Sequence, residues 1–446
     1  MSRHLRGFAW SLGIFLAVAQ IAGAQPPPIV HERAPLTDDI REIAQSNNGF
    51  AVDIYRGLTA AKPGENVLVS PLSISTALAM TYAGARGRTA EQMADALHFT
   101  LPDDRLHAAF GDLLADLGDA REGYELGIAN RLFGQEGFAF KQPFLDTLDS
   151  AYAAPLEQLN FVGDWERSRE HINDWVEEKT RDRIEELLPA GSVNELTRLV
   201  LTNAIYFNGN WKHQFKKEAT HEAPFYLAGN GQTQAPLMYQ KQKFLYGRFG
   251  DVQMLEMPYV GDDLSMVIVL PDAISGLAAV EASLSADLLD TRMAAMTEQE
   301  VEVYLPKFTF ESSFELPDAL QALGITDLFD PWLADLTGMA DAGLFITRAI
   351  HKTFIDVNEE GTEAAGATGV IGGITSVPPP PPVFRADHPF LFALRDRHTG
   401  SLMFLGRVME TDSIAPLSTS NVPEPETWLL LTSGVIAFWR QRQRRP

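Results

Sequence analysis

Residues 356–382 have the sequence DVNEEGTEAAGATGVIGGITSVPPPPP, a long run of small and polar residues between two apolar, strand-like segments. Loops in compact domains are usually about 4 to 6 residues long, and unstructured loops beyond about 12 to 15 residues are usually functional or disordered. Every second residue from Thr362 to Gly372 is small or β-branched, and Glu363 falls on the opposite face of this alternation. The stretch therefore predicts a segment that is exposed as a loop but can be buried as a strand within a sheet.

The composition of the chain excludes several classes of function. Its 446 residues carry a formal net charge of -23, which repels nucleic-acid backbones and anionic lipids. The chain has no cysteine, which excludes disulfides, catalytic thiols and thiolate metal sites. It also lacks a G-x-S-x-G nucleophile elbow, a G-x-x-x-x-G-K-[ST] phosphate loop and an H-E-x-x-H zinc motif. We expect a protein that is not an enzyme and that has no metal, no cofactor and no nucleic-acid partner.

The N-terminal residues have the three parts of a secretory signal. Arg3 and Arg6 precede the apolar stretch Phe8–Ile21, and the small residues Ala22-Gly23-Ala24 form a cleavage pattern. An uncleaved membrane anchor is the alternative, but the apolar stretch is short for a spanning helix of roughly 20 residues. We therefore expect residues 1–24 to be a signal peptide and the protein to be secreted.

The C-terminus has a second targeting pattern. A polar linker over 411–421 leads to Val422-Pro423-Glu424-Pro425, the apolar segment Trp428–Trp439 and an arginine cluster within 440–445. This order resembles the PEP-CTERM sorting tail of exopolysaccharide-forming Gram-negative bacteria, which a membrane-embedded exosortase processes at or near the Pro-Glu-Pro motif. The apolar segment has twelve residues, fewer than the roughly 20 of a spanning helix, and a frayed amphipathic tail is the alternative. The resemblance implies a bacterial protein with a sorting tail at 422–446, an exosortase-type partner, and a location at the cell surface or in the exopolysaccharide matrix.

Residue periodicity between the two ends predicts an α+β fold. Helical spacing of apolar residues occurs at 38–58, 71–83, 89–97, 106–117, 143–152 and 165–187. Strand patterns occur at 66–70, 125–133, 199–207, 253–259, 265–270, 300–310, 349–357, 390–394 and 402–408. The segment 199–207 is almost continuously apolar, as in a strand that is covered on both faces. Because helices are concentrated before Leu187 and strands after it, an α+β architecture is favoured over repeated βαβ units.

Two polar residues lie inside apolar strand segments. Asn203 lies within 199–207 and His351 within 349–357. Such residues are more often core groups with satisfied hydrogen bonds than ligands or catalysts. Ser70 and Ser73, at the junction of a predicted strand and a predicted helix, are candidate hydroxyl partners if the four residues converge beneath the sheet.

Several motifs in a fixed order resemble the serpin family over about 38–410. They are Asn66–Ile74 with Gly84–Gly87, Leu201–Trp211, His351–Thr362 and Phe384–Phe392. The resemblance implies a single serpin domain at 38–410, with about three β-sheets, eight or nine helices and an exposed reactive-centre loop at about 359–382. It also implies that Trp211 lines the breach, where loop insertion begins. The shutter, where strands 3A and 5A separate, is implied to consist of Ser70, Ser73, Asn203 and His351.

Serpins inhibit serine proteases as suicide substrates, and loop insertion is their switch. A protease attacks the loop and forms an acyl-enzyme, the cleaved loop inserts between strands 3A and 5A, and the distorted protease cannot complete hydrolysis. The resemblance therefore implies an irreversible inhibitor, expected to be a monomer, whose partner is a serine protease. Insertion requires a hinge without bulk or charge on its buried face. The matching hinge residues are Gly361, Thr362, Glu363, Ala364, Ala365, Gly366, Ala367 and Thr368. The alternatives are a flexible Gly/Ala linker and a non-inhibitory serpin that acts as a binding or carrier protein in the extracellular matrix.

The family's spacing from Gly361 places the scissile bond at Thr375-Ser376. The prolines Pro378–Pro382 exceed the family norm, so Ile374-Thr375 and Ser376-Val377 stay open as alternatives. The residues around the bond are small or β-branched and include no Arg or Lys, which favours an elastase-like or subtilisin-like protease over a trypsin-like one. A threonine at the primary site also suits cross-class inhibitors of cysteine proteases. The predicted helix 106–117 has no basic face, which argues against activation by heparin.

Overall fold

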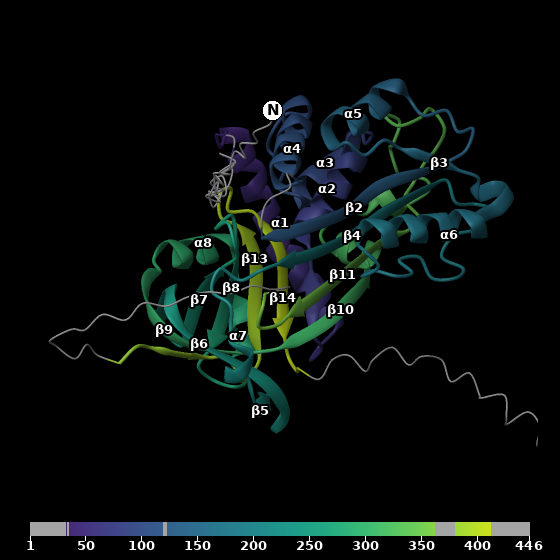
Figure 1. Cartoon of the computed structure of the whole chain (residues 1–446). Coiled ribbons are helices and arrows are strands. Elements are labelled where there is room, and N and C mark those ends of the chain that lie inside the picture. Colours follow the sequence, from purple (N-terminus) through teal and green to yellow (C-terminus); the bar gives the residue numbers. More distant parts are fainter. Residues whose placement is uncertain (1–32, 34, 119–122, 362–379, 412–446) are drawn as a thin grey trace, which may run out of the picture. The chain divides into compact units, whose positions relative to one another are not determined.

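The computed structural model describes residues 33, 35–118, 123–361 and 380–411. Apart from Arg33, these residues belong to one compact unit that begins at Pro35 (Figure 1). Its helices are α1 (Asp38–Ala61), α2 (Pro71–Tyr82), α3 (Gly87–Ala96), α4 (Asp103–Gly118), α5 (Gln142–Tyr152), α6 (Phe161–Lys179), α7 (Leu277–Ser283), α8 (Ala286–Ala294) and α9 (Pro317–Ala322). Its strands are β1 (Val67–Val69), β2 (Tyr124–Gln135), β3 (Glu157–Leu159), β4 (Leu199–Gly209), β5 (His221–Leu227), β6 (Gly231–Phe249), β7 (Val252–Pro258), β8 (Leu264–Pro271), β9 (Thr297–Pro306), β10 (Phe308–Glu315), β11 (Ala349–Val357), β12 (Val383–Arg385), β13 (Phe390–Asp396) and β14 (Leu402–Val408).

A five-stranded sheet has the strand order β10-β11-β4-β2-β3 (Figure 1). At its centre β4 and β11 are parallel neighbours, whereas β4 and β2 are antiparallel. β4 is buried on both faces, in agreement with its apolar sequence. Leu201 and Ile205 belong to the main hydrophobic core, and Val200 and Ala204 belong to a second apolar cluster that includes residues of α6. The line along which β4 and β11 meet is called the seam below.

The other described strands form a sheet with the order β1-β14-β13-β8-β7-β6-β9-β12, in which β5 also pairs with β6. The family resemblance predicts about three sheets, whereas hydrogen bonds join the described strands into two. The reason is β6, which is 19 residues long and pairs in turn with β5, β9 and β7. β12 pairs in parallel with β9 and is an edge strand among the described residues.

Helix α2 is buried between the two sheets. Its residues from Pro71 to Thr81 are all buried, and it contains no charged residue. It contacts β14 of one sheet and β2 and β4 of the other. Pro71 begins the helix, and the Ser70 hydroxyl caps it by accepting a hydrogen bond from the Ser73 N–H (3.3 Å). This junction brings Ser70 and Ser73 beneath the five-stranded sheet.

Some elements differ from those predicted. The helix predicted over 165–187 is α6, which ends at Lys179 before Arg181 and Asp182 adopt positive φ angles of 50° and 58°. The strand predicted over 300–310 is two strands, β9 and β10, which are separated by Lys307 after Pro306. β6 is missing from the sequence prediction, because its buried and exposed residues do not alternate regularly. No helix among the described residues is both long and apolar enough to cross a membrane.

Candidate functional site: shutter and breach

The four residues predicted for the shutter lie together beneath the seam. Asn203 and His351 are opposite each other in the parallel register. The Ser70 backbone N–H donates to His351 Nε2 (2.9 Å), so the proton of the neutral ring lies on Nδ1. The Nδ1–H then donates to Asn203 Oδ1. Burial lowers the pKa of His351 to about 3, which keeps the ring neutral at neutral pH.

Asn130 of β2 completes this network, although the sequence did not predict its role. It lies opposite Asn203 in the antiparallel register. Asn130 Oδ1 accepts hydrogen bonds from Ser73 Oγ–H (2.9 Å) and Asn203 Nδ2–H (3.2 Å). The Asn130 Nδ2–H donates to the Ser73 carbonyl (3.0 Å). The available signal is the same as for Asn203, an amide within the apolar strand segment 125–133.

The shutter network connects α2 to β2, β4 and β11. Ser70 adds a link to the other sheet, because its Oγ–H donates to the Met403 carbonyl of β14 (2.6 Å). The side chains of the network are buried, which shields their hydrogen bonds from water. The contact between His351 and Asn203 crosses the seam itself. A strand that enters between β4 and β11 must break this contact.

Trp211, predicted to line the breach, lies where the seam opens. The register between β4 and β11 ends at Tyr206 opposite Phe354, although both strands continue. Trp211 Nε1–H donates to the Asn358 carbonyl (3.0 Å), and the Trp211 backbone N–H donates to the Glu360 carbonyl (3.1 Å). These bonds hold the segment that follows β11 against the end of β4.

Gly361 is the last described residue before the predicted insertion segment, and its position requires glycine. Its φ is 98°, and an added Cβ would lie 2.3 Å from the Trp211 backbone nitrogen and 2.4 Å from the Gly209 carbonyl oxygen. The predicted hinge residues 362–368 and the candidate scissile residues 374–377 lie outside the described residues. The predicted signal peptide and sorting motif also lie outside them.

The two acidic residues before Gly361 form ion pairs. The Glu359 side chain is 7% exposed and lies 2.9 Å from Lys307 Nζ. Thr220 Oγ–H donates to the same carboxylate (2.9 Å). Burial alone would raise the pKa of Glu359, but its hydrogen bonds, above all that from Lys307, outweigh burial and lower the pKa. Glu360 pairs with Lys217, so the start of the loop is held by charge as well as by backbone bonds.

Comparison with known proteins decides the family. The family model described as Serpin (serine protease inhibitor) matches residues 45–411, most of the chain. The chain belongs to the serpin family. It is 44% identical over 378 residues to the leukocyte elastase inhibitor of Bos taurus, with 83% of this chain and 99% of that protein covered. Serpin B6 of Pongo abelii is 42% identical over 371 residues, with 82% and 98% covered. The crystal structure of uncleaved ovalbumin matches with a TM-score of 0.76 and 32% identity, covering 83% of this chain and 100% of that chain.

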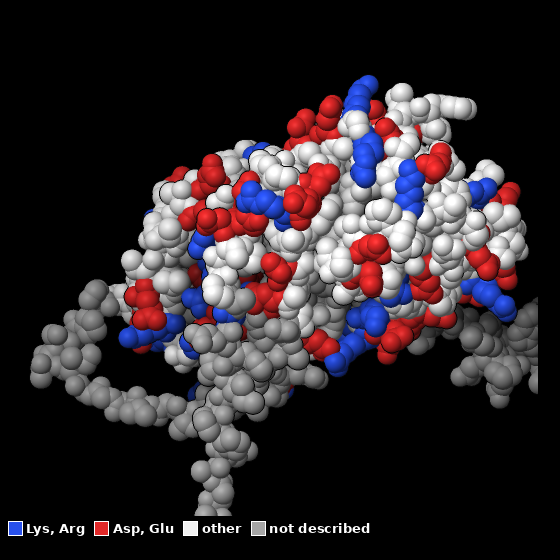
Figure 2. Space-filling view, turned by 90° about the horizontal axis from the view of Figure 1, so that it is seen from above, with Lys and Arg blue, Asp and Glu red and all other residues white. Residues whose placement is uncertain are grey.

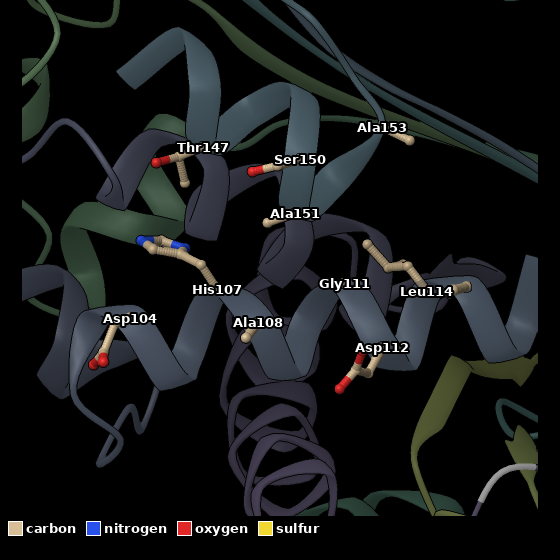
Figure 3. Close-up of a pocket in the computed structure, with 11 residues that line it drawn as sticks. Asp104, His107, Ala108, Gly111, Asp112, Leu114, Thr147, Ser150, Ala151 and Ala153 are labelled. Carbon is tan, nitrogen blue, oxygen red and sulfur yellow. The ribbon is translucent and has the colours of Figure 1, made fainter. Parts of the chain in front are cut away.

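Membership of the family confirms the predicted serpin fold, and it confirms a protease inhibitor rather than an enzyme. A hollow of about 680 Å³ between α4 and α5 of this serpin contains the residue types of a hydrolase triad without their arrangement (Figure 3). The Ser150 Oγ–H donates to the Asp146 carbonyl of its own helix (2.6 Å). His107 Nδ1 is paired with the Tyr152 hydroxyl (2.7 Å), and burial lowers the pKa of His107 to about 4. The hydroxyl and the imidazole are therefore engaged elsewhere rather than with each other.

The charged side chains of this serpin do not gather into a broad basic surface on the face shown in Figure 2, where acidic and basic residues are interspersed. α4 begins with Asp103 and Asp104, and its single arginine, Arg105, donates through Nε–H to Asp39 (3.0 Å). Within the ranges that the structure describes, no group of three or more His, Asp or Glu residues is arranged to hold a metal ion.

Proposed function

We propose that this serpin, as a monomer, inhibits a serine protease by inserting its cleaved loop between β4 and β11. The supporting observation is the parallel pairing of these strands, whose seam opens where the chain leaves β11 toward the loop. A segment that folds back from Gly361 into the seam runs antiparallel to both strands. Insertion would replace one parallel pairing by two antiparallel pairings, which are slightly more stable per residue. The cleaved loop would therefore gain hydrogen bonds and burial.

The composition of the hinge supports an inhibitory member of the family. Its inward positions are Thr362, Ala364, Gly366 and Thr368, which are small or β-branched and uncharged. Bulky or charged residues at these positions would favour the second hypothesis, a non-inhibitory binding or carrier protein. The hinge sequence contains none on this face.

The proposed target is an elastase-like or subtilisin-like serine protease. The candidate scissile segment 374–377 is small and β-branched and suits a shallow specificity pocket. The name of the relative from Bos taurus, leukocyte elastase inhibitor, is consistent with this class. A cysteine protease is the alternative target.

The proposed location is outside the cell of a bacterium, at its surface or in an exopolysaccharide matrix. The signal pattern at 1–24 and the PEP-CTERM-like pattern at 422–446 support export and processing by an exosortase-type enzyme. Mass spectrometry of the protein purified from its native host tests this proposal. We expect a chain that starts at Gln25 and ends near Pro425, and a chain with both ends intact would contradict it.

The test of inhibition is incubation of the chain, starting at Gln25, with pancreatic-type elastase, subtilisin, chymotrypsin and trypsin. Denaturing gels report whether a covalent complex forms, and N-terminal sequencing of the released C-terminal fragment locates the scissile bond. We expect a denaturant-resistant complex with elastase or subtilisin and a fragment that starts at Ser376 or a neighbouring residue. Cleavage without a complex for all four proteases would favour the non-inhibitory hypothesis.

A further inference from the structure

The C-terminal end of the loop is held by a short edge strand. β12 has three residues and pairs in parallel with β9. The Glu302 N–H donates to the Pro382 carbonyl (3.0 Å), but prolines 380–382 have no N–H to extend the ladder toward the loop. The paired residues of β12 hold this end of the loop, and contacts of the residues that follow β12 add to that hold, beginning with the Ala386 N–H, which donates to the Tyr304 carbonyl (2.9 Å).

His388 lies in that following segment and is 7% exposed. Its Nδ1 is 3.0 Å from Asp387 Oδ1, and its Nε2 is 2.7 Å from the Pro271 carbonyl oxygen at the end of β8. A carbonyl oxygen can only accept a hydrogen bond. The Asp387 carboxylate also accepts from the Arg385 Nε–H (2.7 Å), as an ionised carboxylate does. Because both ring nitrogens face acceptors, only the imidazolium form of His388 donates to both.

The charges around His388 favour this form. Asp387 is its neighbour in the chain, and Arg385 lies on β12. Asp272 follows β8, and it pairs with Arg248 of β6. Burial alone would lower the pKa of His388, but the hydrogen bonds to Asp387 and to the backbone carbonyl, together with the charges of Asp387 and Asp272, outweigh burial and raise the pKa.

We propose that His388, as an imidazolium, is a positioning residue that holds the C-terminal anchor of the reactive loop, and that loss of its proton at alkaline pH loosens this anchor. The functional part rests on the inhibitory function proposed above. A neutral ring that keeps its Nδ1–H toward Asp387 turns an Nε2 lone pair toward the Pro271 carbonyl, so the link to β8 is lost. The Tyr226 N–H of β5 still donates to the Asp387 carbonyl (2.8 Å). A loosened anchor presents the scissile segment in more conformations, which slows its capture by a protease.

Thermal unfolding of the full chain tests the anchor without any protease. Because the pKa of His388 is raised above its ordinary 6.5 in the folded state, the stability that it contributes is complete below 6.5 and is lost as the pH rises through the raised pKa. His107 and His351 shift in the opposite direction and titrate below 6.5. We expect the unfolding midpoint of wild type to exceed that of H388Q most at about pH 6 and to approach it by about pH 9.5. H213Q is the control, because burial lowers the pKa of His213, so this imidazole should show no such trend above pH 6.5.

Histidine NMR of the wild-type chain provides a second measurement that does not require H388Q to fold. We expect the imidazole of His388 to titrate with a midpoint above its ordinary 6.5. A wild-type chain in which no imidazole titrates above 6.5 overturns the proposal. A midpoint difference between wild type and H388Q that is constant with pH overturns it as well.

The functional arm uses a protease that the gel assay shows to be captured. The ratio of the association rate constants of wild type and H388Q at each pH cancels the protease's own pH dependence. We expect a several-fold advantage of wild type near neutral pH that shrinks at alkaline pH. A constant ratio overturns the positioning role even if His388 titrates as expected. If no protease is captured at any pH, the inhibitory function fails, and the unfolding and NMR results still decide whether His388 holds the anchor.

Discussion

His351 of β11 and Asn203 of β4 face each other across the seam, and the His351 Nδ1–H donates to Asn203 Oδ1. The same ring accepts from the Ser70 N–H at the start of α2. One neutral imidazole thus joins the helix beneath the sheet to the two strands between which we propose that the cleaved loop inserts. Its protonation state is therefore coupled to the integrity of the sheet.

Acidification should destabilise the native sheet through His351. In the unfolded chain its pKa is near the ordinary 6.5, whereas in the folded chain burial lowers it to about 3. Between these values the unfolded state binds a proton that the folded state does not, so stability falls as the pH falls below 6.5, by up to about 1.4 kcal/mol per pH unit. Urea unfolding of wild type and His351→Gln from about pH 7.5 to 4.5 measures, for each protein, the slope of the free energy of unfolding against pH.

His351→Gln should lose less stability than wild type over this range. His107, whose pKa is lowered to about 4, contributes in the same direction, and His107→Gln measures its share. Identical slopes for wild type and His351→Gln would show that this ring is not the group that titrates.

Asn130 should be as important to the shutter as the residues predicted from sequence. Asn130→Ala leaves the Ser73 hydroxyl and the Asn203 amide without their acceptor in a buried site. Each unsatisfied buried group costs about 1–3 kcal/mol, so we expect a loss of at least this size in the free energy of unfolding. Urea unfolding measures it, with substitution of the exposed Gln142 of α5 by alanine, Gln142→Ala, as the control. If Asn130→Ala and Ser73→Ala were fully additive, the two residues would not act through their mutual hydrogen bonds.

Sequence patterns predict those residues of this site that differ in polarity from their neighbours in the chain. Asn203 and His351 are conspicuous because they interrupt apolar strand segments. Asn130 interrupts one too, but Arg131 follows it directly, and only the register between β2 and β4 brings it to Asn203. The Lys307–Glu359 ion pair also cannot be predicted from the sequence, because it depends on how β9, β10 and β11 are placed. Tertiary pairing, rather than local propensity, also determines the length of β6.

Gly361 should be intolerant of any side chain. Gly361→Ala places a Cβ against the Trp211 backbone nitrogen and the Gly209 carbonyl oxygen. It also holds the alanine at a φ of 98°. Backbone strain of this kind costs about 1–3 kcal/mol before the clash is included. We expect a lower unfolding midpoint and faster cleavage of the loop by non-target proteases. Gly343→Ala is the control, because a Cβ there meets no atom within 4 Å; equal effects of the two substitutions would argue against a constrained hinge.

Thr362→Arg should convert the inhibitor into a substrate. Thr362 is predicted to be the first inward-facing residue of the inserted strand. A buried, unpaired guanidinium costs several kcal/mol, so insertion should stall while the protease completes hydrolysis. The stoichiometry of inhibition, titrated against a captured protease, should rise several-fold, and gels should show cleaved chain in place of the complex.

Glu363→Arg is the matched control for this prediction. It introduces the same side chain one residue further on, where the alternation of a strand points it to the opposite face. Because an outward arginine stays hydrated, Glu363→Arg should still trap protease with nearly wild-type stoichiometry. The reverse result, with Thr362→Arg active and Glu363→Arg a substrate, would mean that the inserting face is the other one. If both variants remained full inhibitors, burial of this part of the hinge would not be required for trapping.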